Sequence, residues 1–332
     1  MSKPNFILEQ VSLKPYSWFG TDGIARYFVN LKNNKEFIET VSWAKQNNIK
    51  ISILGLGANI LISDENNELC IVKMFGENKS YEYLDEQTGI LTVDAGFDFQ
   101  EIILYAIATA HLFGLEEFSG IPSSVGAAIY INLHYYDFFI AQYIHSVQIY
   151  DTETNTIFTA NQQWCAFGYD ESTIKKNKRY IILSVSFILK RGTIFDSWYA
   201  QGRRVEIIRH RQNRYPHTYT CGCFFKNFNT TNPFLIKRAN GKPITAASYY
   251  LDQANARAVC QHGNAHVSWQ HANMIVHTGS ATSADIISVA RKMQKIVYQK
   301  YGLLLEPECE LLGFQQYPLF TAETIVIEGS SQ

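Results

Sequence analysis

The segment Gly55-Leu-Gly-Ala-Asn59 constrains the fold more than any other feature of this 332-residue chain. It stands between two short apolar runs, 51–54 and 60–62, that have the length and composition of buried strands. No long helical pattern follows the glycines, so the loop does not belong to a nucleotide fold of the Gly-x-Gly-x-x-Gly kind. The glycines permit positive φ values and turn main-chain N–H groups toward an anion such as pyrophosphate. A tight hairpin turn is the competing interpretation.

A second loop of this kind is Gly120-Ile-Pro-Ser-Ser-Val-Gly126. Its proline fixes one φ angle, and its hydroxyls and main-chain N–H groups are donors that carry no net charge. The alternative is a buried loop that satisfies its own backbone through Ser123 and Ser124. Two such loops in one chain weaken that alternative and favour a phosphate-bearing ligand.

Apolar periodicity divides the chain into three parts. It predicts helices over 35–45 and 99–113, the second one ended by Gly114, and strands over 91–95, 144–150, 154–160 and 180–189. The segment 191–213 is rich in Arg, Gln and Asp and has few large core residues, so we interpret it as a linker with a short helical run at 205–208. Beyond it we expect a helix that starts at 248, a strand over 274–277, and a long helix from Ser283, as N-cap, to a stop at Gly302. The predicted domains are 1–72, 73–194 and 195–332.

Composition narrows the class of protein. Hydrophobic residues make up 46% and charged residues 18% of the chain, and the formal net charge is -1, which indicates a globular protein without a nucleic-acid partner. No apolar run approaches the roughly 20 residues of a membrane span, and the first six residues lack a secretion signal, so we expect a cytoplasmic protein, which we take to be a monomer. The six cysteines and nine histidines show no zinc-ligand or thioredoxin spacing, so we predict reduced thiols and no metal site.

Longer runs of this chain, taken in order, resemble the UDP-N-acetylenolpyruvoylglucosamine reductases, also called UDP-N-acetylmuramate dehydrogenases. The resemblance covers nearly the whole chain, and the short stretch between Leu189 and Cys221 is similar to the second type of that family. The matching runs are Phe19–Gly23, Leu54–Leu61, Val93–Gly96, Gly114–Asn132, Phe167–Tyr169, Gly222–Asn227, Ala247–Gln253, Gly263–Ser268, His271–Asn273 and Leu305–Glu308.

The resemblance implies an α+β fold in which a two-lobed FAD-binding domain of the vanillyl-alcohol-oxidase (PCMH) type precedes a C-terminal α+β substrate-binding domain. It also implies that NADPH reduces non-covalently bound FAD, which then delivers hydride to the enolpyruvyl double bond of a UDP-sugar in peptidoglycan precursor synthesis. The positions that would hold FAD are Gly55, Leu56, Gly57, Ala58, Asn59, Ile60, Gly96, Ile121, Pro122, Ser124, Val125, Gly126 and Asn132.

Two catalytic positions follow from the resemblance. Cys223 stands where the family has a serine proton donor, and a thiol gives up a proton more readily than an alcohol does; a small buried thiol that only fills space is the alternative. Glu308 matches a glutamate that assists the enolate, and the alternative for it is a surface carboxylate. The positions that would contact the substrate are Tyr169, Arg214, Lys226, Asn227, Gln253 and His271.

The chain departs from the family pattern at Asp170, a further position that we assign to catalysis. The family has Gly-Tyr-Arg-Asp-Ser, whose arginine binds the enolpyruvyl carboxylate, and this chain has Gly-Tyr-Asp-Glu-Ser at 168–172. Reversing a charge about 4 Å from a carboxylate is worth several kcal/mol at an effective dielectric of roughly 20. Either another arginine replaces the lost cation (Arg179, Arg211 or Arg214), or Asp170 is turned away, or the substrate differs.

The second departure is the bulky segment 132–137, where the family has a small-residue turn near the flavin. His134 and Tyr136 either contact the cofactor or belong to a surface loop. Two further functions stay open beside the reductase. One is a paralogous FAD oxidoreductase that acts on another substrate, and the other is a non-catalytic protein that binds flavin or a sugar nucleotide.

Overall fold

The computed structural model describes residues 2–217 and 219–329, and its contacts divide the chain into two compact units. Unit 1 contains the residues up to Glu9, Tyr27–Leu56 and Leu69–Asn213. Unit 2 contains Gln10–Arg26, Gly57–Glu68 and the chain from Arg214 onward. The predicted division into 1–72, 73–194 and 195–332 stays a prediction.

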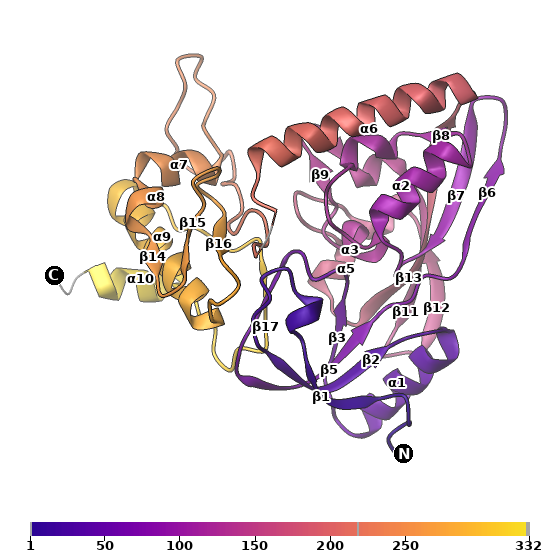
Figure 1. The fold of residues 1–332 in the computed structure, drawn as a ribbon, viewed down its shortest axis with the longest axis horizontal. Coiled ribbons are helices and arrows are strands. Elements are labelled where there is room, and N and C mark those ends of the chain that lie inside the picture. Colours follow the sequence, from indigo (N-terminus) through magenta and orange to yellow (C-terminus); the bar gives the residue numbers. More distant parts are fainter. Residues whose placement is uncertain (1, 218, 330–332) are drawn as a thin grey trace. The chain divides into compact units, whose positions relative to one another are not determined.

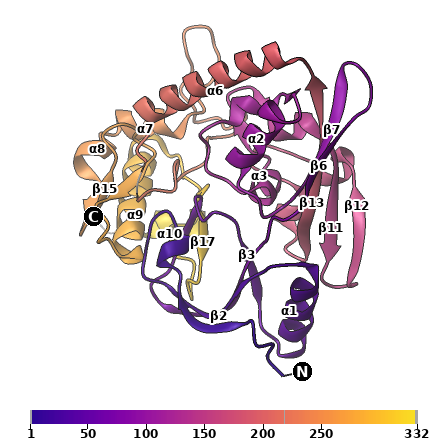
Figure 2. The ribbon, with the colours of Figure 1, turned by 45° about the vertical axis from the view of Figure 1, so that its right-hand side comes forward.

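Unit 1 is built on a large antiparallel sheet, shown in Figure 2. Its order is β12 (Thr156–Ala160), β11 (Ile144–Asp151), β13 (Tyr180–Arg191), β7 (Thr88–Asp94) and β6 (Lys79–Tyr83), and β8 (Leu112–Phe113) also pairs with β13. The helices α2 (Phe99–Ala108) and α3 (Val125–Tyr130) share one hydrophobic core with this sheet. Rings of Phe99, Phe118 and Phe187 are fully buried there because apolar residues of helix and strand face each other.

A second core of unit 1 contains the helix α1 (Asn34–Gln46) and the unit 1 residues of a sheet of order β1 (Leu8–Ser12), β2 (Ile24–Asn30), β5 (Asn66–Lys73) and β3 (Ile51–Leu54). Asn33 caps α1 by accepting a hydrogen bond from the Glu36 N–H at 3.0 Å, so the helix predicted over 35–45 is confirmed. The strands over 51–54 and 60–62 are confirmed too. The hairpin interpretation is wrong, because β3 pairs in parallel with β5, and β4 (Ile60–Ile62) with β17 (Glu310–Leu312).

Two local predictions need correction. The helix predicted over 99–113 ends at Ala108, because His111 takes a φ of 48° and the next two residues form β8 against β13. Both β8 residues are buried, so their apolar character fits a strand as well as a helix. The N-cap of the long C-terminal helix α9 (Ser283–Tyr301) is Thr282 and not Ser283: its hydroxyl accepts from the Asp285 N–H at 3.1 Å, and the Asp285 carboxylate accepts from the Thr282 N–H at 3.1 Å.

The linker predicted over 191–213 is wrong over most of its length, because it forms the 21-residue helix α6 (Ile194–Arg214), which Figure 1 shows along the outer side of unit 1. Ser197, Ala200 and Ile207 are its buried residues. The Ser197 hydroxyl donates to the Ile107 carbonyl at 2.8 Å, which ties α6 to the end of α2. The inward face therefore contains few large apolar residues, and the segment lacks the usual pattern of an amphipathic helix.

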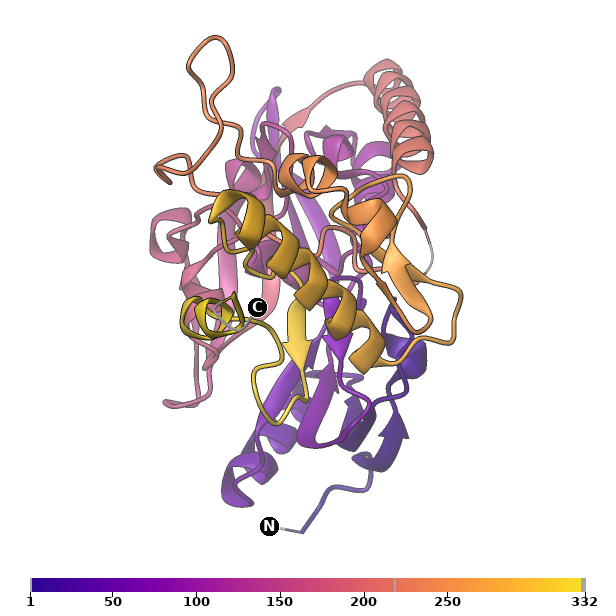
Figure 3. The same cartoon turned by 90° about the vertical axis from the view of Figure 1, so that its left-hand side faces the viewer.

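Unit 2 packs α9 against a sheet of order β14 (Gln261–His262), β15 (Ala265–Val267) and β16 (Ile275–His277), as Figure 3 shows. The helices α7 (Ala247–Gln253) and α8 (Ala256–Val259) complete its core, and Gly302 ends α9 with a φ of 66° as predicted. The remaining elements are η1 (Lys14–Tyr16), η2 (Leu115–Phe118), η3 (Ile140–Tyr143), β9 (His134–Tyr135), β10 (Phe138–Phe139), α4 (Gln162–Cys165), α5 (Thr173–Lys176) and α10 (Ala322–Gly329). Across residues 2–217 and 219–329, no helix combines the length and the apolar character that crossing a membrane requires.

Candidate active site

The loop from Gly55 to Asn59 offers main-chain donors that the protein itself does not use. Gly57 has a φ of 68°, and a Cβ there would lie 1.9 Å from the Tyr16 carbonyl oxygen, so only glycine fits. None of the five N–H groups from 55 to 59 donates to another group of the described residues. The Asn59 Oδ1 is likewise buried without a hydrogen-bond partner among them. Because nearly all buried N–H groups in proteins are paired, this loop fits the oxygen atoms of a bound ligand such as the FAD pyrophosphate.

The second loop uses most of its polar groups within the fold. The N–H of Val125 donates to Phe97 at 3.0 Å, and that of Gly126 donates to Ala95 at 2.8 Å. The Ser124 hydroxyl caps α3 by accepting from the Ala127 N–H at 3.3 Å, and the Ser123 hydroxyl donates to the Ser124 carbonyl at 2.9 Å. The self-satisfied alternative therefore holds for both hydroxyls. The N–H groups of Ser123 and Ser124 have no acceptor in the described part of the chain, and they are the donors that this loop can offer.

Three of the predicted cofactor positions have a clear function in the fold. A Cβ on Gly96 would lie 2.1 Å from the Phe75 carbonyl oxygen, and one on Gly126 would lie 3.0 Å from the Ala95 Cβ, so both glycines allow close packing. The Asn132 side chain donates to the Gly168 carbonyl at 2.7 Å and accepts from the Ala141 N–H at 3.2 Å. A contact of these residues with FAD stays a prediction.

The two departures from the family pattern meet inside unit 1. Asp170 is only 2% exposed, and its Oδ1 lies 3.4 Å from Nδ1 of His134, which belongs to the bulky segment 132–137. The His134 ring stacks on Phe139 at 5.3 Å between centroids and lies 4.6 Å from the ring of Tyr169. The other carboxylate oxygen of Asp170 is buried and has no hydrogen-bond partner in the described structure. Asp170 is thus turned toward His134 and away from solvent, a pairing that sequence reasoning missed.

The three candidate arginines have different surroundings. Arg179 forms ion pairs with Glu153 and, at 3.5 Å, with Asp151. Arg211 lies beside the second loop, since a Cβ built on Gly120 would be 3.4 Å from its Cδ. Arg214 belongs to unit 2 and acts electrostatically on His271. Arg179 is therefore paired with carboxylates of the protein. Of the three arginines, Arg211 is the one that lies next to a loop assigned to the cofactor.

Unit 2 brings the two predicted catalytic segments side by side. The Glu308 N–H donates to the Phe224 carbonyl at 2.8 Å, so Cys223 and Glu308 lie on adjacent stretches of chain. Cys223 is half-buried and forms a β-bridge with Met274 on its other side. Asn273 fixes this arrangement, because its side chain donates to the Phe225 carbonyl at 2.7 Å and accepts from the Phe225 N–H at 3.1 Å. Asn273 lies in one of the matching runs, which was the signal that could have identified it.

Two further cysteines adjoin this site. Burial and a hydrogen bond with the Cys309 thiol raise the pKa of Cys221 well above its usual value, and the charge of Glu308 adds to the shift. Cys221 and Cys309 are both buried, whereas Cys223 is half-buried. All six cysteines are free thiols. At neutral pH Cys221 therefore stays protonated. Among these three cysteines, Cys223 has the most accessible thiol.

The predicted substrate-binding residues of unit 2 include a buried histidine, His271, and residues in or next to helix α7. Burial, followed by the positive charges of Arg214 and Arg257, lowers the pKa of His271 to about 4, and its Nδ1 is buried without a hydrogen-bond partner among the described residues. Asn227 accepts from the Ala247 N–H at 3.1 Å at the start of α7, whereas Gln253 is the last residue of that helix. At 1.5 Å per residue, the two ends of α7 are about 10 Å apart. Lys226 is half-buried beside Asn227.

Comparison with known proteins gives the same order of domains. Residues 25–161 match a family model described as an FAD binding domain, and residues 214–312 match the C-terminal domain of UDP-N-acetylenolpyruvoylglucosamine reductase. Curated proteins of that name include one from Solibacter usitatus, 28% identical, with 91% of this chain and 95% of the relative covered. Another, from Caldicellulosiruptor saccharolyticus, is 29% identical, with 96% and 95% covered. The chain belongs to the UDP-N-acetylenolpyruvoylglucosamine reductase family.

The solved structure of UDP-N-acetylenolpyruvylglucosamine reductase from Thermus caldophilus has the same fold, with a TM-score of 0.71, 24% sequence identity, and coverage of 92% of this chain and 100% of that one. The predicted α+β fold with an FAD-binding domain is confirmed, and FAD is the cofactor of this reductase-family chain. In residues 2–217 and 219–329, no group of three or more His, Cys, Asp and Glu side chains is placed to hold a metal ion.

Proposed function

We propose that the chain reduces UDP-N-acetylglucosamine enolpyruvate to UDP-N-acetylmuramate, with NADPH as reductant, in cytoplasmic peptidoglycan precursor synthesis. Support comes from its family and from one observation in unit 2. A hydrogen bond of 2.8 Å from the Glu308 N–H to the Phe224 carbonyl holds the main chain of Glu308 against the segment that carries the half-buried Cys223. This combination of a proton donor and a stabilising acid is what reduction of an enol ether requires.

When bound, FAD supplies the hydride that NADPH has delivered to it. We assign the binding of its pyrophosphate to N–H groups that the protein leaves unused, those of the loop Gly55–Asn59. Such donors stabilise an anion without adding a full charge.

Cys223 and Glu308 complete the reduction on the substrate. Hydride addition to the enolpyruvyl double bond leaves an enolate, whose negative charge spreads onto the carboxylate. The Glu308 carboxyl group, in its protonated form, stabilises that charge by donating a hydrogen bond, and Cys223 transfers its thiol proton to the adjacent carbon, so that one hydride and one proton together saturate the double bond.

The substrate anions require cations, and the structure reduces the choice. Lys226 of unit 2 is assigned to the diphosphate, with His271 as a neutral hydrogen-bonding group, since its pKa of about 4 keeps it uncharged at neutral pH. For the enolpyruvyl carboxylate, Arg211 and Arg214 stay candidates. Arg179 does not, because Glu153 and Asp151 already engage it.

The test is an anaerobic titration of the purified protein, followed by its flavin absorbance. NADPH is expected to bleach the bound flavin, and UDP-N-acetylglucosamine enolpyruvate is then expected to restore the oxidised spectrum. Cys223→Ser keeps a proton donor and should retain much of the reoxidation rate, whereas Cys223→Ala should lower it by a factor of about 100 or more, the usual contribution of a proton donor. Equal reoxidation rates for the serine and alanine variants would remove Cys223 from the mechanism.

A paralogous FAD oxidoreductase with a different substrate is the second candidate. The observation that favours it is the burial of Asp170 against His134 at the position where the family has its carboxylate-binding arginine. In that case NADPH would bleach the flavin, and dioxygen, but not the UDP-sugar, would restore its colour.

A further inference from the structure

Helix α6 presents most of its large apolar residues to solvent. Five large apolar side chains on its outward side are between 53% and 83% exposed, and we call them the α6 stripe; they are Ile194, Phe195, Trp198, Tyr199 and Val205. Their spacing places them on one side of the first three turns. The inward side carries Arg204, whose Nε is buried without a hydrogen-bond partner in the described structure and whose pKa is lowered by burial. A surface helix normally has the opposite arrangement, so the stripe has the character of a covered surface.

A glycine lies in the middle of the stripe. A Cβ built on Gly202 would meet no other atom within 4 Å, so nothing in its own chain requires a glycine there. Inside a helix, glycine is about 1 kcal/mol less favourable than alanine. A glycine at an exposed helix position does, however, allow a second backbone to approach closely.

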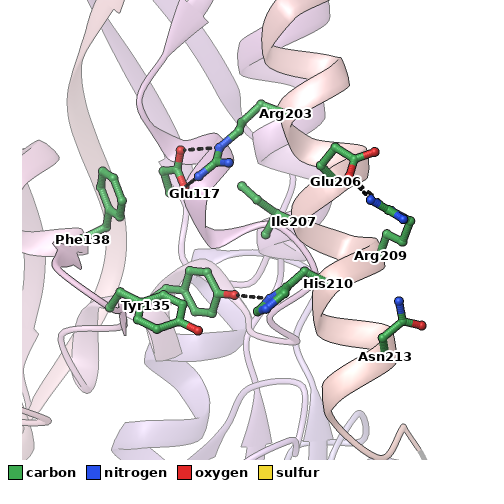
Figure 4. Close-up of a pocket in the computed structure, with 10 residues that line it drawn as sticks. Glu117, Tyr135, Phe138, Arg203, Glu206, Ile207, Arg209, His210 and Asn213 are labelled. Carbon is green, nitrogen blue, oxygen red and sulfur yellow. Dashed lines mark hydrogen bonds and ion pairs between the residues drawn. The ribbon is translucent and has the colours of Figure 1, made fainter.

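The second half of α6, beyond the stripe, borders a pocket of about 500 Å³, shown in Figure 4. Tyr136 and Phe138 line it from the β9–β10 hairpin, and Glu206 and Arg209 line it from the second half of α6. Its walls are held by a hydrogen bond of 3.1 Å between Tyr135 Oη and His210 Nδ1 and by the paired hydrogen bonds, 3.0 Å each, from Arg203 to Glu117. One helix thus carries a protruding apolar surface and, next to it, a hollow with aromatic walls.

We propose that the chain forms a two-fold symmetric dimer in which α6 lies antiparallel to α6 of a second copy and the helices cross at Gly202. Two-fold symmetry about Gly202 pairs a residue before Gly202 with the partner's residue that lies the same number of positions after Gly202. Phe195 then meets the partner's Arg209 at the pocket, Trp198 meets the partner's Glu206, and Tyr199 meets the partner's Val205. The first pair is a cation–π contact, the second a hydrogen bond from the indole N–H to a carboxylate, and the third an apolar contact.

The charges on α6 favour a second copy over a lipid surface. Arg203 pairs with Glu117, and Arg209 pairs with Glu206 at 2.5 Å, so the outward side has little positive excess for anionic lipid headgroups. The exposed Arg209–Glu206 pair contributes little energy and is easily exchanged for contacts with a partner.

The exposed area of the α6 stripe is close to what each subunit of a stable dimer buries. Five side chains of about 200 Å² each, more than half exposed, offer roughly 600 Å² per subunit. A standard interface buries about 800 Å² per partner, and the pocket residues supply the difference. This proposal differs from the monomer that we expected from the sequence.

The experiment measures the molar mass of the full chain by sedimentation equilibrium up to about 100 µM, far above the Kd of about 1 µM at the weak end of the range for interfaces of standard size. The native chain should be a dimer, and Gly202→Glu should halve its mass because two carboxylates would meet at the crossing point. The variant should still fold, since glutamate is a better helix former than glycine and its side chain has open space. The control is Gln299→Glu, an exposed position of α9, which should stay dimeric.

A cross-link tests the crossing point. Gly202→Cys should form an intersubunit disulfide in oxidised glutathione, because its two copies face each other on the symmetry axis, while Gln299→Cys should not. A monomeric native chain at 100 µM, or a Gly202→Glu variant that stays dimeric, would overturn the proposal.

Discussion

His271 makes a measurable contribution to the pH dependence of stability. Its pKa falls to about 4 in the folded protein, first through burial and then through the charges of Arg214 and Arg257. In the unfolded chain a histidine has a pKa of about 6.5. As the pH falls below 6.5, the unfolded chain binds this proton before the folded protein does, so acid favours unfolding.

The size of the effect follows from the two pKa values. Stability that is fully present above pH 6.5 is lost as the pH falls through the folded pKa of about 4. At pH 5 the loss relative to pH 7 is about 2 kcal/mol, and the complete shift of roughly 2.5 units corresponds to about 3 kcal/mol. Replacing His271 by glutamine removes this titration and leaves all other titrating groups in place.

The assay is urea unfolding of the native chain and of His271→Gln between about pH 5 and pH 7. We expect the native chain to lose about 2 kcal/mol more than the variant over this interval. His262→Gln, at an exposed histidine of the same unit, is the control and should follow the native chain. Parallel pH dependences of the native chain and His271→Gln would refute the reasoning. His277, whose burial also lowers its pKa, is common to all three proteins and cancels in the difference.

Three further predictions concern the site. Asn273→Ala deprives the buried Phe225 N–H and carbonyl of their partner and should lower the free energy of unfolding by about 2–4 kcal/mol, measured in urea. Gly57→Ala forces a side chain against a carbonyl 1.9 Å away at a positive φ, so the purified variant should carry less FAD, as its absorbance near the flavin maximum would show. Replacing Arg211 or Arg214 by methionine should raise the KM for the UDP-sugar at least tenfold. Replacing Arg179, which is held by carboxylates, should leave the KM unchanged.

The regular elements could be predicted from the sequence because their patterns are local. α1 and α9 show apolar residues at helical spacing and end in recognisable caps, and β7 and β13 are apolar runs of strand length. α6 could not be predicted in this way, because most of its large apolar residues face outward and its inward side includes Arg204. A method that assumes an apolar side facing the core must fail on a helix with the reverse arrangement.

The candidate site was only partly predictable, because glycine and serine report backbone geometry and not ligand contact. Gly96 and Gly126 stood in the expected loops, yet their N–H groups donate to carbonyls of the protein. The pairing of Asn273 with Phe225 joins residues 48 positions apart, and no local pattern indicates it. Only the fold distinguishes the donors that the protein uses from those it leaves for a ligand.

The two departures from the family pattern, Asp170 and the bulky segment 132–137 with His134, depend on each other. A buried carboxylate without a partner costs several kcal/mol, so Asp170 alone would destabilise unit 1. The His134 imidazole at 3.4 Å offsets that cost, and the rings of Phe139 and Tyr169 hold it in place. A double-mutant cycle of Asp170→Asn and His134→Gln should therefore show a coupling of about 1–3 kcal/mol in urea unfolding. If the two losses simply add, the residues are independent, and the loss of the family's arginine needs a different structural explanation.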